Sequence, residues 1–462
     1  MKKVVVLVAI VFAAFGAFVS SSYAQVNLIA VGSLTNSSAG PWTDLSGLTN
    51  TLENGVPASL LGGFGSGIAW AGGNTFLAVP DRGPNAVSYD SAVDDTVSYI
   101  ERFHTIVMDL APNTSTGLPF VLTPILQSTT LFYSPSPLVY GGGVGLGVGP
   151  GEPPQNGPSR NYFVGRSDNF DPNQTSGYSK DARLDSEGIR LSNDGQLVYT
   201  SDEYGPYVNV FLRASGQRVR SFRLPDDFFV SNLSSMGSVE ISGNTSGRVA
   251  NKGMEGLAIT PDGKTLVGII QNALIQDAAQ GGVAANLLRI VTIDTDTGKT
   301  THEYAYLLST GSGVSEIVAI NNHEFLVDER DGKGRGAQNK AKVKQLFKID
   351  LNRAIDVTGM DGLTAAANAV TKTLFLDIVK VLTGNGISAG QIPAKIEGLA
   401  FGSDVVMNGP PVHTLWVAND NDFLNEVDDG SGNVIANPNQ FFVFGFTDAD
   451  LNGSQYIPQQ FH

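Results

Sequence analysis

One pattern of apolar and polar positions occurs five times along the chain. Each copy has an acid or a serine, usually a glycine, an apolar run typical of a buried strand, a turn, and a second apolar run that ends in polar residues. The copies begin at Ser66, Glu187, Glu255, Glu316 and Glu397. Because each copy contains two strand-like runs joined by a short turn, the pattern predicts five β-hairpins built to one plan.

Further strand-like runs of β-branched and aromatic residues follow these hairpins. Two such runs follow each of the first four hairpins, whereas the fifth is followed by one, at residues 440–446. A spare run near the N-terminus, at residues 26–31, can complete the fifth unit. Consecutive four-stranded units whose two chain ends pair are typical of a β-propeller, in which neighbouring sheets bury each other's faces.

The sequence therefore predicts an all-β protein, a propeller of five four-stranded blades closed by pairing of its N- and C-terminal strands. The Gly- and Pro-rich stretch 134–186 leaves room for a sixth blade. Two separate β-sandwiches are the main alternative architecture. We expect a single domain over residues 25–462, with residues 134–186 as an insertion.

The first 24 residues have the parts of a secretory signal peptide. Lys2 and Lys3 precede an apolar run over residues 4–19, and Ser22 and Ala24 stand at the positions that a signal peptidase reads. The apolar run is short for a bilayer span, although an uncleaved anchor is the alternative. We expect cleavage before Gln25 and export to the periplasm or the medium, with no membrane association afterwards.

Composition limits the chemistry that the chain can perform. There is no cysteine, which excludes disulfides, thiolate catalysis and cysteine-ligated metals. The formal net charge of −15 argues against a nucleic-acid partner, because phosphates need a basic surface. The five histidines share no metal-ligand spacing, which disfavours a transition metal. We expect a monomer that acts on a small molecule.

The turns of the hairpins place their polar ends together. The turn at residues 193–195 brings Glu187 opposite the neighbourhood of Ser201, because residues equidistant from a turn face each other across the strands. The turn at residues 261–263 brings Glu255 near Gln271 in the same way. Applied to every copy, this argument gathers one set of residues at one mouth of the propeller: Asp81, Arg82, Glu187, Asp202, Glu203, Glu255, Gln271, Glu316, Glu329, Arg330, Glu397, Asn419 and Asp420.

So many carboxylates around one opening must be protonated, paired with basic residues, or bound to a cation. Carboxylates mixed with Asn and Gln suit Ca²⁺, which takes 6 to 8 oxygen ligands in a flexible geometry. We predict a Ca²⁺ site whose ligands are Glu187, Asp202, Glu203, Glu255, Glu397 and Asp420. The alternative is structural: the Glu-Gly pairs form hydrogen-bonded corners that fix the start of each blade, and both roles can hold at once.

Several strings at these positions resemble a phytase-like family described as "esterase-like activity of phytase". They are D-R-G-P at 81–84, E-G-I at 187–189, S-D-E-Y-G-P at 201–206, E-G-L-A at 255–258 and E-G-L at 397–399. The similarity extends over residues 60–446. The resemblance implies a secreted or periplasmic propeller that hydrolyses phosphate esters or other esters, and it supplies no established catalytic residue.

The chemistry of the residues suggests roles within such a hydrolase. We predict Asp81, Arg82 and Glu203 as catalytic residues, and Arg82, Lys252 and Arg330 as contacts for the substrate, a small-molecule ester or phosphate ester. Because an acidic mouth repels phosphate, activity should require the cation. For each arginine, a salt bridge to a neighbouring acid is the alternative role. A propeller that binds a ligand or a protein without catalysis is the alternative function, because propellers host both.

Overall fold

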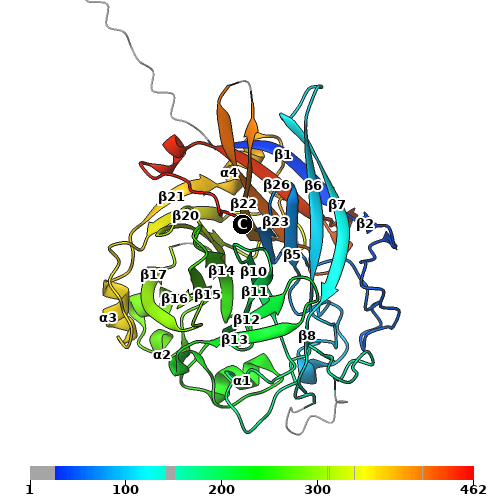
Figure 1. Cartoon of the computed structure of the whole chain (residues 1–462), viewed down its shortest axis with the longest axis vertical. Coiled ribbons are helices and arrows are strands. Elements are labelled where there is room, and N and C mark those ends of the chain that lie inside the picture. The colour runs from blue at the N-terminus through cyan, green and yellow to red at the C-terminus, as the bar shows by residue number, and fades with distance from the viewer. Residues whose placement is uncertain (1–25, 142–150, 310, 312, 338, 408) are drawn as a thin grey trace, which may run out of the picture.

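The computed structural model describes residues 26–462 except 142–150, 310, 312, 338 and 408. Five four-stranded antiparallel sheets follow one another around a common axis (Figure 1), which confirms the predicted five-bladed propeller. The predicted signal peptide, residues 1–24, lies outside the described residues and stays a prediction. None of the helices in the described part of the chain has the length and apolar character that crossing a membrane requires.

Each of the first four blades is formed by strands that are consecutive within their sheet. The first blade contains β4 (Gly67–Trp70), β5 (Thr75–Val79), β6 (Arg102–Pro112) and β7 (Phe120–Leu131), and the second contains β10 (Ser186–Leu191), β11 (Leu197–Asp202), β12 (Tyr207–Leu212) and β13 (Arg218–Arg223). The third contains β14 (Met254–Ile259), β15 (Thr265–Ile270), β16 (Leu287–Asp294) and β17 (Thr300–Leu307), and the fourth contains β18 (Gly313–Ala319), β19 (Glu324–Arg330), β20 (Lys344–Asp350) and β21 (Lys372–Asp377).

The fifth blade joins the two ends of the chain. Its order is β22 (Lys395–Val406), β23 (Pro411–Asp420), β26 (Asn439–Phe446) and β1 (Asn27–Leu34). β1 and β26 are antiparallel, with Leu28 opposite Phe444. This pairing confirms the predicted closure, and it removes the open edges that an unclosed ring of sheets would expose.

Short elements decorate the ring. They are β2 (Asn36–Ser37), β3 (Gly40–Pro41), β8 (Tyr133–Ser134), β9 (Asn161–Tyr162), β24 (Glu426–Asp428), β25 (Val434–Ala436), α1 (Gly237–Gly243), α2 (Ile275–Ala278), α3 (Gly362–Ala367), α4 (Ile378–Gly384) and the 3₁₀ turns η1 (Ser91–Val93), η2 (Asp226–Phe228), η3 (Gly282–Asn286) and η4 (Asp448–Leu451). In its described part, the stretch 134–186 forms no sixth blade, and its strand β9 pairs with β8.

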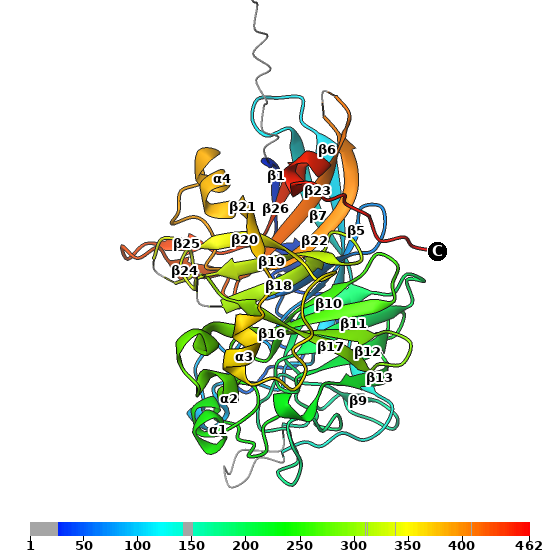
Figure 2. The ribbon, with the colours of Figure 1, turned by 90° about the vertical axis from the view of Figure 1, so that its left-hand side faces the viewer.

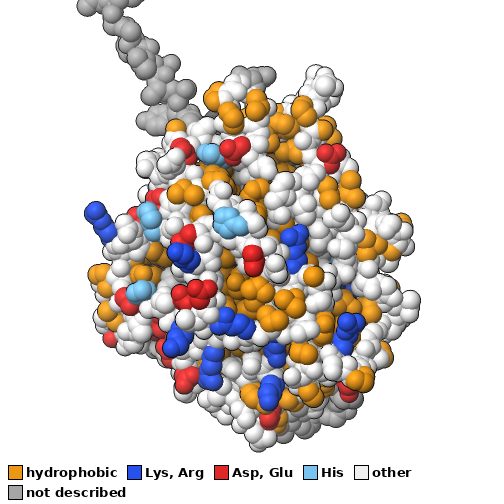
Figure 3. Space-filling model, in the orientation of Figure 1, with side chains coloured by type: hydrophobic (Ala, Val, Ile, Leu, Met, Phe, Trp, Pro, Cys, Tyr) orange, Lys and Arg blue, Asp and Glu red, His pale blue; other side chains and the backbone are white. Residues whose placement is uncertain are grey.

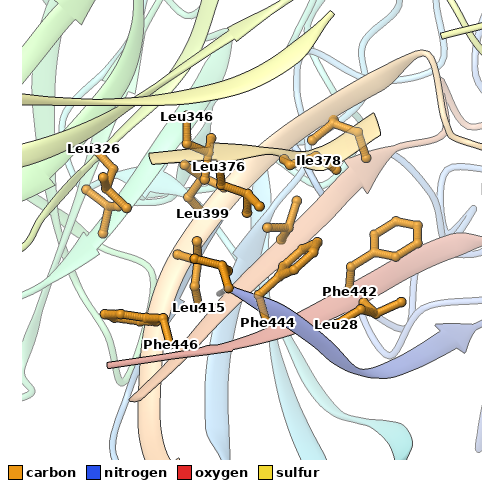
Figure 4. Packing of buried hydrophobic residues seen from close by; sticks show 14 of the residues in the cluster. Leu28, Leu326, Leu346, Leu376, Ile378, Leu399, Leu415, Phe442, Phe444 and Phe446 are labelled. Carbon is orange, nitrogen blue, oxygen red and sulfur yellow. The ribbon is translucent and has the colours of Figure 1, made fainter. Parts of the chain in front are cut away.

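The core lies between neighbouring blades, because each sheet is apolar on both faces near the axis. Figure 4 shows the contact of the fourth and fifth blades, where Leu346 of β20 and Leu399 of β22 lie near Phe444 of β26 and Leu28 of β1. All four side chains are almost fully buried. Burial of a large apolar side chain contributes about 1.5–3 kcal/mol, so this contact also fixes the N-terminal strand in the fifth blade.

The first strands of the blades crowd together at the axis. β14 contacts β10 and β18, β4 contacts β10 and β22, and β18 contacts β22, so that the five strands form a closed ring. The glycines that follow Glu187, Glu255 and Glu397, which we call the mouth glutamates, allow this approach. A Cβ atom added to Gly256 would lie 2.8 Å from the backbone nitrogen of Ile317 in the next blade. In each Glu-Gly pair, the glycine therefore lets the neighbouring blade pack closely, and the glutamate places a carboxylate at the mouth.

A buried ion pair ties the ring together at its centre. Arg190 of β10 lies 3.0 Å from the carboxylate of Glu316 in β18. The Arg190 guanidinium also donates to the carbonyls of Ile68 and Ile317, and Glu316 accepts from the backbone N–H of Leu257. Burial lowers the pKa of Arg190 and raises the pKa of Glu316 to about 7. One pair of side chains thus connects the first strands of four blades.

The C-terminal segment lies over one end of the axis, and the acidic residues lie at the other. Ile457 donates its backbone N–H to Ile320, and Gln459 donates to the carbonyl of Leu191, both near the ends of first strands. Figure 2 shows the C-terminus on one side of the ring and α1, α2, β24 and β25 on the other. Figure 3 shows the side that carries the C-terminus, where acidic and basic side chains are interspersed.

Replacement of the axial acid should destabilise the whole ring. In Glu316→Ala, the Arg190 guanidinium is left as an unpaired buried charge, so we expect a loss of about 3–5 kcal/mol in the free energy of unfolding. Urea denaturation followed by tryptophan fluorescence measures it. The control is Asp226→Ala, because the Arg223–Asp226 pair is exposed and should contribute less than about 1 kcal/mol. Equal effects of the two substitutions would contradict the role of Glu316.

Candidate functional site

Local backbone irregularities place the mouth glutamates. The register of β10 shifts between Ser186 and Ile189, and that of β14 shifts between Met254 and Gly256, so that a bulge falls at Glu187 and at Glu255. β22 has the same shift around Glu397. A bulge bends its strand and redirects a side chain, and bulges are common next to active sites. These three glutamates lie at the end of the axis away from the C-terminal segment.

Three carboxylates form the tightest acidic group in the described part of the chain, which we call the triad: Asp185, Glu187 and Glu203. One oxygen from each lies within 4.8 Å of the others. Asp185 precedes β10, Glu187 lies within it, and Glu203 follows β11, so that one blade supplies all three. Asp185 and Glu203 are almost fully buried, and Glu187 is 9% exposed.

Burial and repulsion between carboxylates raise the pKa values of Glu187, Glu203 and the neighbouring Glu255. Burial is the main cause of the raised pKa of Glu187, and the carboxylates of Glu255 and Asp185 add to it. Burial together with Asp185 raises the pKa of Glu203 to about 7. Glu255 shares a hydrogen bond with Glu203, and burial, Glu203 and Glu397 raise its pKa well above the usual range. At neutral pH, a proton or a cation must therefore lie among these groups.

Basic residues neutralise the periphery of the acidic group. Arg82 lies 2.7 Å from Asp185 and also donates its backbone N–H to that carboxylate. Lys395 lies 2.5 Å from Asp420 and 3.9 Å from Asp81. Arg330 forms an ion pair with Glu397. Each of the two predicted anion-contact arginines is therefore paired with an acid, as their alternative role predicted.

Two buried acids beside Lys395, Asp81 and Asp420, also have raised pKa values. Burial raises the pKa of Asp81 to about 7, against the opposing effect of Lys395. Burial raises the pKa of Asp420 well above its usual range, and Lys395 again opposes the shift. These two acids and the triad form one electrostatic unit, because Asp185 contributes to the raised pKa of Asp81.

The structure brings most of the predicted residues together and separates a few. Glu187 and Glu203 belong to the triad, Glu255 and Glu397 adjoin it, and Asp81, Arg82, Arg330 and Asp420 surround it. Lys252 donates to Gln271, at 3.2 Å, and its charge partly opposes the rise in the pKa of Glu203. The catalytic, substrate-binding and ligand roles of these residues stay predictions.

Asp202, Glu329, Glu316 and Asn419 have structural partners of their own. Asp202 accepts from the backbone N–H groups of Asp185 and Tyr204, so it positions the loops that carry the triad and is not a member of it. Glu329 accepts from Tyr306 and pairs with Lys372. Glu316 is held by Arg190 at the axis, and Asn419 accepts from the backbone N–H of Gln440.

Sequence reasoning missed Asp185 and Lys395. Both stand two residues before a mouth glutamate, Asp185 before Glu187 and Lys395 before Glu397. Lys395 is also the strand partner of Asp420 in the hairpin of the fifth blade. The same position holds Gly253 and Val314 in the third and fourth repeats, so a comparison of the repeats does not mark it as functional.

A comparison with known families identifies the family of the chain. The model of a Phytase-like family, described as "Esterase-like activity of phytase", matches residues 59–423. The chain belongs to this family. The match includes the triad, Arg82, Glu255, Arg330, Lys395, Glu397 and Asp420. The residues that carried the resemblance in the sequence are therefore those that this Phytase-like propeller gathers at its acidic mouth.

The individual proteins that match this chain share limited sequence identity with it. An uncharacterized secreted protein from Arthroderma benhamiae is 34% identical to this Phytase-like chain over 188 residues, which cover 34% of this chain and 36% of that protein. The match thus spans about a third of the relative. A luciferin-regenerating enzyme has a TM-score of 0.33 at 12% identity, covering 83% of this chain and 92% of its own. A putative 6-phosphogluconolactonase from Bacteroides uniformis has a TM-score of 0.32 at 16% identity, covering 90% and 98%.

The raised pKa of Glu187 predicts a specific dependence of stability on pH. A carboxyl whose pKa is raised on folding favours the folded state below its unfolded pKa, near 4.5, and that stability is lost as the pH rises through the higher folded pKa. In cation-free protein, Glu187→Gln should therefore raise the melting temperature at pH 8 by about 2–4 °C and change it little at pH 4.5. Differential scanning calorimetry in EDTA measures the effect.

The matched control is Glu426→Gln, which removes the charge of an exposed acid in β24. It should leave the melting temperature almost unchanged at both pH values. If Glu187→Gln melts at a lower temperature than the wild type at pH 8, the ionised Glu187 stabilises the folded protein. That result would contradict the raised pKa.

Proposed function

We propose that this Phytase-like protein is an exported ester hydrolase that acts on small-molecule phosphate esters with the help of Ca²⁺. The description of its family supports ester hydrolysis, and the secreted relative from Arthroderma benhamiae supports export. The observation that carries the proposal is the triad: three buried carboxylates with oxygens within 4.8 Å of one another. We expect the protein to act as a monomer, because one blade supplies all three carboxylates.

The residues present fit a hard cation. Carboxylate oxygens are the ligands that Ca²⁺ prefers, and Asp185, Glu187 and Glu203 would hold it, with Glu255 adjacent to Glu203. The nearby bases Arg82, Arg330 and Lys395 form ion pairs with Asp185, Glu397 and Asp420. Among the described residues, no basic side chain forms an ion pair with Glu187 or Glu203. When bound, the cation would supply positive charge that attracts phosphate oxygens and polarises the ester.

Arg82 holds the site in shape and provides charge for an anionic substrate. Its side chain contacts Asp185 and Asn251, and its backbone N–H also donates to Asp185, so the guanidinium is fixed beside the triad. A guanidinium in a fixed position can bind phosphate oxygens with two parallel hydrogen bonds. Arg330 would contribute further positive charge near Glu255, and Lys252 near Glu203.

Glu203 and Asp81 can hold or release a proton at neutral pH. The pKa of each is raised to about 7, which is the range in which a general acid or base works best. Glu203 lies within the triad, whereas Asp81 lies beside Lys395 and follows β5. In the proposed reaction, Asp81 takes the proton of the attacking water and passes it to the departing alcohol, whereas Glu203 would stay ionised as a ligand while the cation is bound.

Turnover assays test the function. The mature protein should hydrolyse p-nitrophenyl phosphate or phytate when Ca²⁺ is present, and EDTA should abolish this activity in a way that added Ca²⁺ reverses. Bis(p-nitrophenyl) phosphate and p-nitrophenyl acetate separate diesterase and carboxylesterase activity from the proposed activity. Bound Ca²⁺ with no turnover of any of these substrates would contradict the hydrolase and favour the alternative, a propeller that binds without catalysis.

Titration of Ca²⁺ tests the site itself. Because fewer ligand charges weaken Ca²⁺ binding, Asp185→Asn should lower the affinity about tenfold or more, as measured by isothermal titration calorimetry. Glu426→Gln, which removes an acid far from the triad in the sequence and exposed at the surface, should leave the affinity unchanged. Equal affinity of wild type and Asp185→Asn would place the cation elsewhere or nowhere in the propeller.

A further inference from the structure

A polar cavity lies beside the triad, because Arg82 lines the cavity and also pairs with Asp185. Its volume is about 100 Å³, and its lining includes three arginines, Arg82, Arg183 and Arg248, together with four serines and threonines. The loop after β5, the end of the stretch 134–186 and the segment before β14 supply these side chains. Three guanidinium groups line one small cavity inside a protein whose net charge is −15.

Arg183 is the most informative member of this arginine cavity. Its side chain is 2% exposed. One terminal nitrogen, Nη1, donates to the carbonyl of Ser167 at 3.2 Å, and the guanidinium packs over the rings of Phe170 and Tyr204. The other terminal nitrogen, Nη2, is buried and has no hydrogen-bond partner among the described residues. A buried donor without an acceptor is costly, so its position calls for a ligand or ordered water.

Arg82, which lies beside the triad, also has a buried donor without a hydrogen-bond partner in the described part of the chain. Its Nη1 contacts Asp185 and Asn251, but its Nε is buried and has no hydrogen-bond partner within the described chain. Arg248 differs, because it donates to the carbonyl of Tyr204 and to Glu240. Arg82 and Arg183 therefore each have an unused donor, and both line this cavity. Arg248 holds the cavity wall by binding the carbonyl of Tyr204, which follows Glu203 in the chain.

The acids that line the arginine cavity are already engaged. Glu240 accepts from Arg248 at 2.5 Å and from the backbone N–H of Ser234. Asp94 accepts from the backbone N–H of Gly237 at 2.6 Å. Arg183 lies 3.9 Å from Glu240, beyond hydrogen-bond distance. Asp185, outside the lining, pairs with Arg82. Arg82 Nε and Arg183 Nη2 therefore remain as buried donors for an occupant of the cavity.

We propose that the arginine cavity binds a tetrahedral oxyanion, a phosphate group, held by Arg82 Nε, Arg183 Nη2 and neighbouring hydroxyls. Guanidinium groups bind phosphate oxygens more strongly than neutral donors do. One water needs roughly 10–15 Å³, so the cavity has room for the five heavy atoms of phosphate and excludes a large ring. This site does not depend on hydrolysis at the triad, and the phosphate can be free or carried by a larger molecule.

Phosphate titration into cation-free protein tests the proposal without the triad's cation. Inorganic phosphate should bind to the EDTA-treated mature protein, sulfate should compete with it, and acetate should compete weakly because it is planar and carries one charge. Isothermal titration calorimetry measures the affinity, and the melting temperature should rise with phosphate concentration. Competition by p-nitrophenyl phosphate would assign the site to phosphate carried by a larger molecule, and its failure to compete would assign it to free phosphate.

Variants of Arg183 connect the binding to this cavity. Arg183→Met keeps the packing against Phe170 and Tyr204 but removes the donors, and should weaken phosphate binding about tenfold or more. Arg183→Lys keeps the charge without the planar fork, and should weaken binding less; it is the fallback if the Met variant does not fold. Arg218→Met is the matched control, because Arg218 also packs over a ring, that of Phe163, and does not line the cavity.

The outcomes separate this site from the proposed hydrolase. Phosphate binding that survives EDTA and Asp185→Asn but is lost in the Arg183 variants supports the arginine cavity, whatever the turnover assays give. No binding to cation-free protein at about 10 mM phosphate, or equal binding by wild type and both Arg183 variants, would overturn it. Binding that requires Ca²⁺ would also overturn it, because the anion would then be held at the triad.

Discussion

The buried ion pair between Arg190 and Glu316 is the interaction on which the rest of the propeller depends. Five first strands meet at the axis so closely that a Cβ atom at Gly256 would collide with the next blade. Backbone groups turned toward the axis need partners there, and Arg190 and Glu316 supply them to Ile68, Leu257 and Ile317. The two side chains are buried, and their charges compensate each other. The ends of the strands, and the loops that follow them, are placed by this ring.

The same crowding brings carboxylates of different blades close together at the mouth, where they repel one another. Each blade brings its polar end to the axis, and acids that are scattered in the sequence become neighbours in space. The structure neutralises the outer ones with bases, through Arg330 at Glu397 and Lys395 at Asp420. Glu203 and Glu255 share a hydrogen bond, which needs a proton. The remaining charge is concentrated in the triad, and this concentration makes a cation the simplest means of stabilising the site at neutral pH.

The repeats made the fold predictable, because a period in the sequence reports a period in space. The five hairpins, the closure by the N-terminal strand and the meeting of Glu187, Glu255 and Glu397 all follow from local pattern and turn geometry. Long-range partners do not. Glu316 stands at the same repeat position as Glu187, yet Arg190 of another blade captures it. Glu329 occupies a predicted mouth position, but Tyr306 and Lys372 hold it elsewhere. Asp185 and Lys395 share a repeat position with opposite charges, so no motif of fixed chemistry identifies them.

Arg82 belongs to both polar sites, and its two sets of contacts link them. Nη1 pairs with Asp185, whereas the guanidinium also lines the arginine cavity with an unused Nε. In the absence of a cation, the Asp185 charge offsets that of Arg82, and the cavity is less positive than its three arginines suggest. A cation on the triad would draw on the same carboxylate and leave more of the Arg82 charge for an anion. Because coupling between two binding sites is reciprocal, an oxyanion beside Arg82 would in turn favour the cation, and the two proposed sites would strengthen each other.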